Sequence, residues 1–236
     1  MGPNPSLKLI VNGRPPGLGR WYAGHTPWFR PATLPSPPAW LQLEALSGHR
    51  MRSCIQIALR SKRLLLRPLC ESDASDLLVM FSDPKFMEFG TTPPWDSIDD
   101  ARAMINRDIE QMGLGKRLRL GVERVEDQSL LGICTLFNFS EECRSAEIGY
   151  GLNSSTWGNG YMNEALVSLL TYGFSELALN RVEADIDPRN IASAKSLERI
   201  GFKKEGHLRE SCVVNGELTD SALYGLLLSD WNKWVG

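Results

Sequence analysis

Two glycines one residue apart, Gly158 and Gly160, stand where the sequence changes from strand-like to helix-like. Residues 146–152 before them have the composition of a strand, and the residues after them repeat apolar side chains at helical spacing. A strand, a glycine turn and a helix in this order direct several main-chain N–H groups and the positive end of a helix dipole toward one point. That geometry suits a phosphate or pyrophosphate, and a tight turn without a ligand is the alternative.

The glycine spacing differs from the two common nucleotide-binding patterns. A dinucleotide fingerprint needs a third glycine at the position where Asn163 stands. A P-loop ends in Gly-Lys-Ser or Gly-Lys-Thr, and no such triplet follows here. The sequence therefore predicts a phosphate-bearing ligand that is bound in neither of these ways.

The composition is that of an ordinary globular protein, with 42% hydrophobic and 23% charged residues. A net charge of −2 gives no general attraction for nucleic acid or anionic membranes, and no apolar run approaches the roughly 20 residues of a membrane helix. The five cysteines are scattered without a Cys-x-x-Cys pair, so neither a metal site nor a redox motif is predicted. We expect reduced thiols and a cytoplasmic protein.

The composition changes near residue 50, because the residues before it repeat Pro, Gly and Arg with interspersed Trp. We expect an irregular extension over residues 1–60 and one folded domain over residues 61–236. One hypothesis is that Met51 is the natural start and that the preceding residues are vector-derived or come from upstream translation. Peptides from residues 1–50 in mass spectrometry of the native protein would contradict it. The alternative is a docking arm rich in Trp and Pro.

From residue 61 onward, apolar patterning predicts both strands and helices. The predicted helices begin at Ser72-Asp73, at Ser97, after Gly160 and at Asn190, where capping residues or glycine precede helical periodicity. The predicted strands span residues 63–67, 118–125, 130–137, 146–152, 181–186, 208–214 and 222–228, with Asn215-Gly216 turning the last hairpin. Hairpins and crossovers together indicate an α+β fold with a mixed, partly antiparallel sheet.

Five segments in this order resemble the GNAT acyltransferase superfamily, specifically its RimJ/RimL-like branch, which acetylates protein N-termini and other amines. They are residues 63–69, 82–84, 146–150, 157–165 and 187–193 running on to Gly201-Phe202. With Gly206 and Asp220 they extend the resemblance over roughly residues 61–231. It implies a central mixed, mostly antiparallel twisted sheet of about six or seven strands with about four helices, splayed at an acyl-CoA site.

In such proteins the loop before the third helix binds the pyrophosphate of acyl-CoA through main-chain N–H groups. The resemblance thereby implies cofactor contacts from the loop and the preceding strand: Ile148, Gly149, Tyr150, Gly151, Leu152, Trp157, Gly158, Asn159, Gly160, Tyr161 and Met162. Trp157 and Met162 depart from the general pattern Gln/Arg-x-x-Gly-x-Gly/Ala, which weakens a side-chain role at 157 but leaves the backbone donors intact. The pantetheine arm of acetyl-CoA is expected to enter a gap between residues 147–152 and 181–186.

Acyl transfer from a thioester to an amine needs a base for the amine, donors for the oxyanion and assistance for the departing thiolate. Asn190, an expected N-cap, and Ser193, one turn further on, are the leading candidates. The resemblance implies that Asn190 also contacts the coenzyme arm or the acceptor and that Ser193 donates to the leaving sulfur. Many superfamily members place a Tyr where this chain has Leu197, and its absence increases the share expected of Ser193.

The base is less well defined, because relatives can carry a Glu at the position of Cys212. Glu147, on the strand before the loop, and Glu210 are the remaining candidates, and strand alternation would place Glu210 on the same face as Cys212. Either can instead be a solvated carboxylate.

The resemblance further implies that Phe89, Trp95 and Tyr150 line the amine pocket, with packing as the alternative for each. We expect structural roles for His207, at a turn or strand edge, and for Asp220, at a late-strand turn. Catalysis is the alternative for His207, and acceptor binding is the alternative for Asp220.

These features predict an acetyl-CoA-dependent N-acetyltransferase in which a primary amine attacks directly in a ternary complex. A protein N-terminal α-amine is the expected acceptor, and a small amine (an antibiotic, polyamine or amino acid) is the alternative. A coenzyme-binding sensor without catalysis is the alternative of another class, motivated by Cys212. We expect a monomer or homodimer, with neither nucleic acid nor membrane as a partner.

Overall fold

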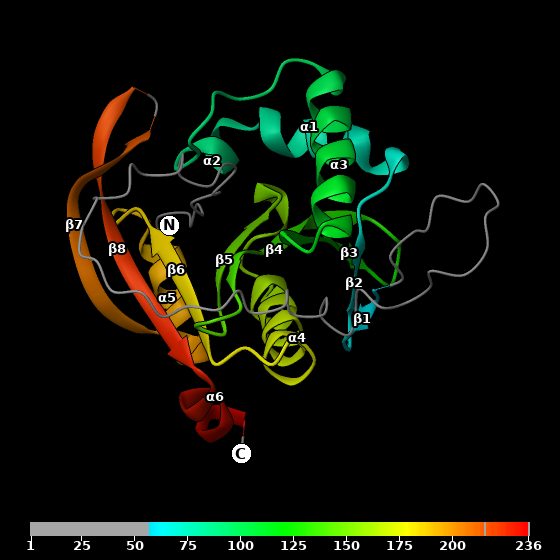
Figure 1. The fold of residues 1–236 in the computed structure, drawn as a ribbon. Coiled ribbons are helices and arrows are strands. Elements are labelled where there is room, and N and C mark those ends of the chain that lie inside the picture. The colour runs from blue at the N-terminus through cyan, green and yellow to red at the C-terminus, as the bar shows by residue number, and fades with distance from the viewer. Residues whose placement is uncertain (1–56, 215, 236) are drawn as a thin grey trace, which may run out of the picture.

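The computed structural model describes residues 57–214 and 216–235. The Pro-rich segment, Met51 and Asn215 of the expected hairpin turn lie outside these residues. The described chain forms one eight-stranded sheet in the order β1-β2-β3-β4-β5-β6-β8-β7, with helices on both faces (Figure 1). The α+β class predicted from the sequence is confirmed.

All neighbouring strands are antiparallel except β5 and β6, which are parallel. The strands are β1 (Leu59–Arg60), β2 (Leu64–Pro68), β3 (Arg117–Arg124), β4 (Leu130–Ser140), β5 (Ser145–Leu152), β6 (Arg181–Ile186), β7 (Lys203–Val214) and β8 (Glu217–Leu227). The eighth strand beyond the seven predicted is β1. Its two residues are too few to carry a periodic signal, and they become a strand only by pairing with β2.

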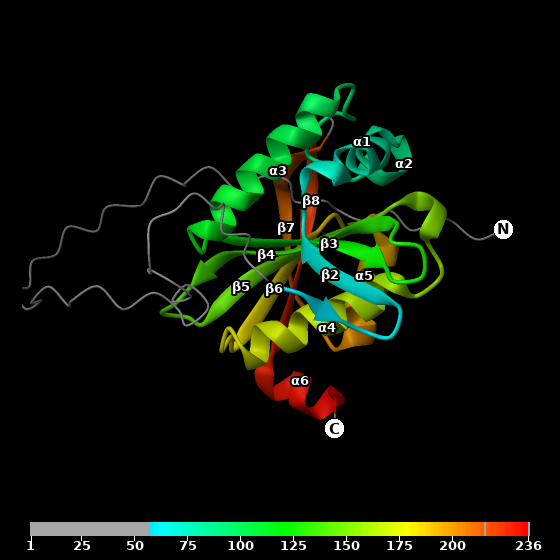
Figure 2. The same cartoon turned by 90° about the vertical axis from the view of Figure 1, so that its right-hand side faces the viewer.

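Helices cover the two faces of the sheet separately (Figure 2). One face carries α1 (Ala74–Ser82), α2 (Pro84–Met87) and α3 (Ile98–Gly113), and the other carries α4 (Tyr161–Ser175) and α5 (Ile191–Ile200). The short α6 (Leu228–Val235) follows β8, and single 3-10 turns occur at Glu71–Asp73 and Ser154–Thr156. The sequence patterns missed α2 and α6, each of which is too short for helical periodicity to stand out.

The helix caps agree only in part with the sequence. The Ser97 side chain accepts from the Asp99 N–H at 3.2 Å, as expected for an N-cap. Asp73 precedes α1 but makes no side-chain cap. Its carboxylate instead accepts from the Cys70 N–H and from the guanidinium of Arg67, so it fixes the turn between β2 and α1.

Two apolar cores lie on opposite faces of the sheet. The larger one packs the sheet against α4 and α5, and its fully buried members include Leu66, Leu120, Leu136, Leu166 and Leu197. The smaller one lies beneath α1, α2 and α3, and includes Leu77, Phe81, Met104 and Ile133. Because both faces are covered, the central strands must bury side chains in both directions, which fixes their register.

The sheet opens between β5 and β6. The two strands pair only at Ser145↔Arg181, Ala146↔Val182 and Glu147↔Glu183, although β5 runs on to Leu152. Over the same length β5 remains paired with β4, and β6 is paired with β8 from end to end. Each strand is therefore held by its other neighbour, and a fork forms between two wings of the sheet (Figure 1).

Candidate active site

The glycine loop connects the end of β5 to α4. Gly158 and Gly160 have φ values of +81° and +74°, a left-handed conformation that favours glycine. Gly160 is the N-cap residue of α4, and no side chain caps this helix. No side chain therefore occupies the N–H groups of its first turn, and the anion site remains a prediction.

Side chains within the loop stabilise its shape. The indole N–H of Trp157 donates to the carbonyl of Leu152 at 2.8 Å, and the amide of Asn159 donates to the carbonyls of Thr156 and Trp157. Met162 is buried in the larger core. All three side chains are thus engaged with the protein itself, two by hydrogen bonds to main-chain carbonyls and one by burial in the core.

Arg63, which immediately precedes β2, connects the glycine loop and α4 to the N-terminal end of that strand. Its main-chain N–H and its Nε each donate to Glu164 at 2.7 Å, and its Nη1 donates to the carbonyl of Asn159 at 3.0 Å. The guanidinium also lies 4.5 Å from the ring centroid of Tyr161. Burial raises the pKa of Glu164, but hydrogen bonds from Arg63 and Ser61 outweigh it and hold the pKa below its usual value.

Sequence reasoning did not select Arg63 as a site residue. Its ion-pair partner Glu164 lies 101 positions away, and no local spacing signals such a contact. The only hint was the position of Glu164 in the first turn of α4, where a carboxylate complements the helix dipole. The pair places the Arg63 guanidinium, balanced by the Glu164 carboxylate, beside the N-terminal end of α4.

On the α5 side of the fork, Tyr150, Ser193 and Asn190 form a buried polar chain. The Tyr150 hydroxyl lies 2.9 Å from Ser193 Oγ, and the Ser193 N–H donates to Asn190 Oδ1 at 3.0 Å. Their exposed fractions are 3%, 1% and 1%. Asn190 caps α5 as predicted. Its Nδ2 is buried and has no hydrogen-bond partner among the described residues, which is unusual for a buried amide.

Glu147 lies at the apex of the fork, where it is the last β5 residue paired with β6. Because side chains alternate along a strand, Glu147 faces the α1–α3 side and Tyr150 faces the α5 side. The half-buried carboxylate accepts a hydrogen bond from Asn138 Nδ2 at 2.9 Å. The two faces of the fork therefore carry different chemistry, a carboxylate on one and hydroxyl and amide groups on the other.

The structure gives Glu210 a different setting from the one that strand alternation predicted. The register shifts from Leu208↔Ser221 to Cys212↔Thr219, and Glu210 lies within this bulge at φ +49°. The bulge interrupts the alternation from which a shared face with Cys212 was inferred, so alternation no longer supports that inference. The Glu210 side chain is exposed.

Asp220 fixes this bulge. It accepts from the Glu210 N–H at 2.9 Å and lies 2.7 Å from His207 Nε2. These two interactions, the Glu210 hydrogen bond foremost, lower the pKa of Asp220. His207 lies on the edge strand β7, as expected, whereas Asp220 lies within β8 and contacts the bulge of β7 instead of a turn.

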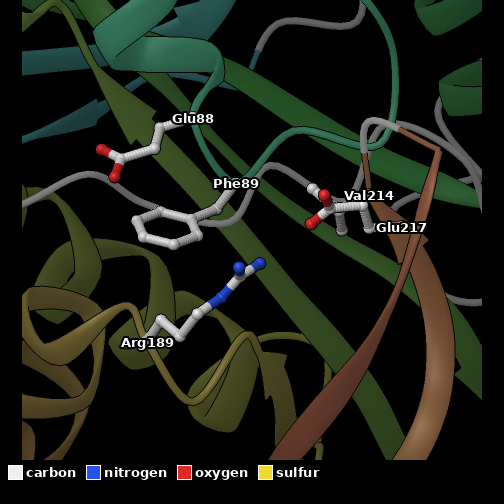
Figure 3. Close-up of a pocket in the computed structure, with 5 residues that line it drawn as sticks. All are labelled: Glu88, Phe89, Arg189, Val214 and Glu217. Atoms are coloured by element: carbon white, nitrogen blue, oxygen red, sulfur yellow. The ribbon is translucent and has the colours of Figure 1, made fainter.

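A hollow of about 230 Å³ lies between the loop after α2, the β6–α5 turn and the tip of the β7–β8 hairpin. Figure 3 shows the side chains that line it, which are Glu88, Phe89, Arg189, Val214 and Glu217. Arg189 extends toward Phe89, with its Cζ 5.9 Å from the ring centroid, and is ion-paired with the buried Asp187 at 2.7 Å. Arg189 immediately precedes Asn190 in the sequence.

The three residues expected in the amine pocket have different surroundings in the structure. Phe89 lines the hollow, whereas Trp95 stacks on Phe81 with ring centroids 4.0 Å apart. Tyr150 directs its hydroxyl to Ser193. Trp95 thus makes a packing contact and Tyr150 a hydrogen bond to α5, and the amine pocket remains a prediction.

Within residues 57–214 and 216–235, no cluster of three or more His, Cys, Asp and Glu side chains could hold a metal ion. In the same part of the chain, no helix has the length and apolar character needed to cross a membrane. Burial raises the pKa of the Cys134 thiol to about 12, so this thiol stays protonated near neutral pH.

Comparison with known proteins identifies the family. An acetyltransferase (GNAT) domain model matches residues 63–203. The uncharacterized N-acetyltransferase p20 of Bacillus licheniformis is 34% identical over 175 residues, covering 73% of this chain and 97% of p20. The [ribosomal protein uS5]-alanine N-acetyltransferase of Escherichia coli is 26% identical over 191 residues, covering 75% and 93%.

A solved structure agrees with the sequence relatives. Mycobacterium smegmatis RimJ in complex with CoA-disulfide superimposes with a TM-score of 0.66 at 26% identity, covering 70% of this chain and 82% of RimJ. The glycine loop, the forked sheet and the family match point to the same conclusion. The chain belongs to the GNAT family and is an N-acetyltransferase.

Proposed function

We propose that this acetyltransferase uses acetyl-CoA to acetylate a primary amine, and that its acceptor is a protein N-terminal α-amine. The fork between β5 and β6 carries the proposal. From Ile148 to Leu152, β5 has no register partner on β6, so one backbone edge of a covered strand remains open to a ligand. Buried backbone groups require partners, and an amide-bearing pantetheine arm supplies them.

The residues at the fork fit such a coenzyme. The uncapped first turn of α4 offers N–H groups for the pyrophosphate, and Arg63 adds a positive charge beside it. The unpartnered amide of Asn190 offers a donor to the arm. Bound acetyl-CoA supplies the activated acetyl group, and the chain's own residues bind, orient and move protons.

Glu147 is the proposed base. An amine approaching the apex from the α1–α3 face meets its carboxylate, which takes a proton as the nitrogen bonds to the acetyl carbon. Main-chain N–H groups of β5 beyond the apex can donate to the oxygen that becomes negative during attack. On the other face, Ser193 donates a hydrogen bond to the departing sulfur.

The choice of an N-terminal amine rests on two considerations. The E. coli relative acts on an alanine of ribosomal protein uS5. An α-amine with a pKa near 8 is roughly 10% neutral at pH 7, whereas a lysine with a pKa near 10.4 is roughly 0.04% neutral. An α-amine therefore needs less help from a base than a lysine does, and a single carboxylate on the face of attack is sufficient for it.

A panel assay tests the function. The full chain is incubated with acetyl-CoA and either N-terminal peptides, N-blocked lysine peptides or small amines, and thiol release is followed. Mass spectrometry then locates the acetyl group. We expect turnover on free peptide α-amines. Faster turnover on a small amine would show that the acceptor is a small amine instead of a protein N-terminus. No turnover above hydrolysis with any acceptor would contradict the proposal.

A further inference from the structure

Tyr150 and Ser193 come from elements 43 positions apart and meet on the α5 side of the fork. Their hydroxyl oxygens are 2.9 Å apart, and both side chains are almost completely buried. Tyr150 lies in the stretch of β5 that has no β6 partner, and Ser193 lies in the first turn of α5. The contact therefore spans the part of the fork that is open to a ligand.

The direction of the hydrogen bond follows from the chemistry of the two hydroxyls. Burial raises the pKa of Tyr150 well above its usual value, so the phenol keeps its proton. A phenol is a stronger donor than an aliphatic hydroxyl, and a serine oxygen can accept one hydrogen bond while donating another. Tyr150 thus donates to Ser193. In the described part of the chain, Ser193 Oγ has no other hydrogen-bond partner, so its own proton is left to donate elsewhere.

A second buried donor lies beside it. Asn190 Nδ2 has no hydrogen-bond partner in the same region, and Asn190 Oδ1 is 3.0 Å from the Ser193 N–H. Buried donors without acceptors are costly in a folded protein. Two of them lie at the start of α5, and Ser193 contacts β5 where that strand has no β6 partner, so they indicate a ligand that brings acceptor atoms.

We propose that Tyr150 is a positioning residue, which fixes the Ser193 hydroxyl so that its proton points to the coenzyme sulfur. This inference rests on the proposed function. As the amine nitrogen bonds to the acetyl carbon, the carbon–sulfur bond breaks and its electron pair remains on sulfur. Glu147 receives the proton from the amine. Ser193 keeps its proton and stabilises the thiolate through a hydrogen bond, so atoms and charges balance without a further reagent.

The test uses coenzyme A itself and requires no acceptor. The thiol of bound coenzyme A is titrated by thiolate absorbance in the wild type, Tyr150→Phe, Ser193→Ala and the double variant. A donor to sulfur favours the thiolate, so we expect the thiol pKa to rise by about one unit in either single variant. The double variant should show no further rise, because Tyr150 acts only through Ser193.

Tyr224→Phe is the matched control. Tyr224 is also buried on this side of the sheet, but its hydroxyl donates to Glu198 rather than to Ser193. In this variant the thiol of bound coenzyme A should have the same pKa as in the wild type. Thermal unfolding verifies that every variant is folded. In turnover, Tyr150→Phe should lower kcat about tenfold and leave the KM for acetyl-CoA unchanged.

The outcomes separate the two proposals. If coenzyme A binds and Tyr150→Phe titrates as the wild type, the positioning role is wrong and the proposed function stands. An equal shift in Tyr224→Phe, or an additive shift in the double variant, also overturns the positioning role. If the wild type does not bind coenzyme A, the proposed function fails and the inference fails with it.

Discussion

Arg63 and Glu164 join the first long strand to the first turn of α4 through two hydrogen bonds of 2.7 Å, one from the main chain and one from the guanidinium. The guanidinium also reaches the carbonyl of Asn159 in the glycine loop. The loop is therefore held from outside its own sequence, and its backbone donors are already in place before a ligand arrives. Such preorganisation reduces the free-energy cost of ordering on binding.

Replacing Glu164 should loosen this arrangement. We expect Glu164→Gln to lower the free energy of unfolding by about 1 kcal/mol, since Arg63 is partly exposed and its contribution is screened. The KM for acetyl-CoA should rise several-fold. Denaturant unfolding and initial-rate kinetics measure both. Glu176→Gln, at the exposed end of the same helix, is the control and should change neither.

Gly160→Glu should abolish coenzyme binding. The substitution strains a residue at φ +74° by about 1 kcal/mol and places a carboxylate at the uncapped end of α4. We expect binding at least about 100-fold weaker by calorimetry, because like charges meet there. Gly216→Glu imposes the same backbone strain at φ +84° in open space and should bind normally. Normal binding by Gly160→Glu would show that the loop has another role.

Glu147→Gln should lower kcat by about 100-fold on an α-amine acceptor, as expected for loss of a general base. Coenzyme binding should remain unchanged. Glu183 is the matched control, because it is the register partner of Glu147 on β6 and its carboxylate pairs with Arg181. Equal losses in Glu147→Gln and Glu183→Gln would point to a general electrostatic effect of the acidic face instead of a specific base.

Acid should weaken the turn between β2 and α1. Burial raises the pKa of Asp73, but hydrogen bonds from Arg67 and Cys70 overcome it and leave the pKa below the usual 3.8. The folded-state pKa is depressed, so this contribution is complete above the unfolded-state pKa and is lost as pH falls through the folded-state pKa.

Asp73→Asn should therefore lower the free energy of unfolding by about 2 kcal/mol at pH 7. The difference in the free energy of unfolding between this variant and the wild type should shrink as the pH falls below about 4, the usual carboxyl pKa. Denaturant unfolding at a series of pH values measures it. Asp76→Asn, on the exposed side of α1, is the control and should show little difference at any pH. A difference for Asp73→Asn that does not vary with pH would contradict an ionic role.

Local signals in the sequence were sufficient for several parts of the site. The glycine turn was predictable because left-handed backbone conformations select glycine at Gly158 and Gly160. The cap at Asn190 was predictable because its side chain bonds to an N–H only three residues later. The apolar pattern of residues 146–152 likewise located β5, the strand that carries Glu147.

Glu210 marks the limit of such local reasoning. Alternation along β7 predicted its face, but a bulge opposite Asp220 interrupts the strand. The bulge is stabilised by a hydrogen bond between β7 and β8. The residue pattern of β7 alone does not predict such an interstrand contact.

The sequence by itself determined the order of the longer strands and helices, the glycine turn before α4 and the cap of α5, because each depends on backbone preferences within a few residues. Only the tertiary structure decided that β5 and β6 separate after Glu147, and that Arg63 holds the loop. It alone placed the Tyr150 hydroxyl against Ser193. These relationships join residues distant in the chain, and they follow from which strands pair and which helix covers them, a choice that packing of the whole domain makes.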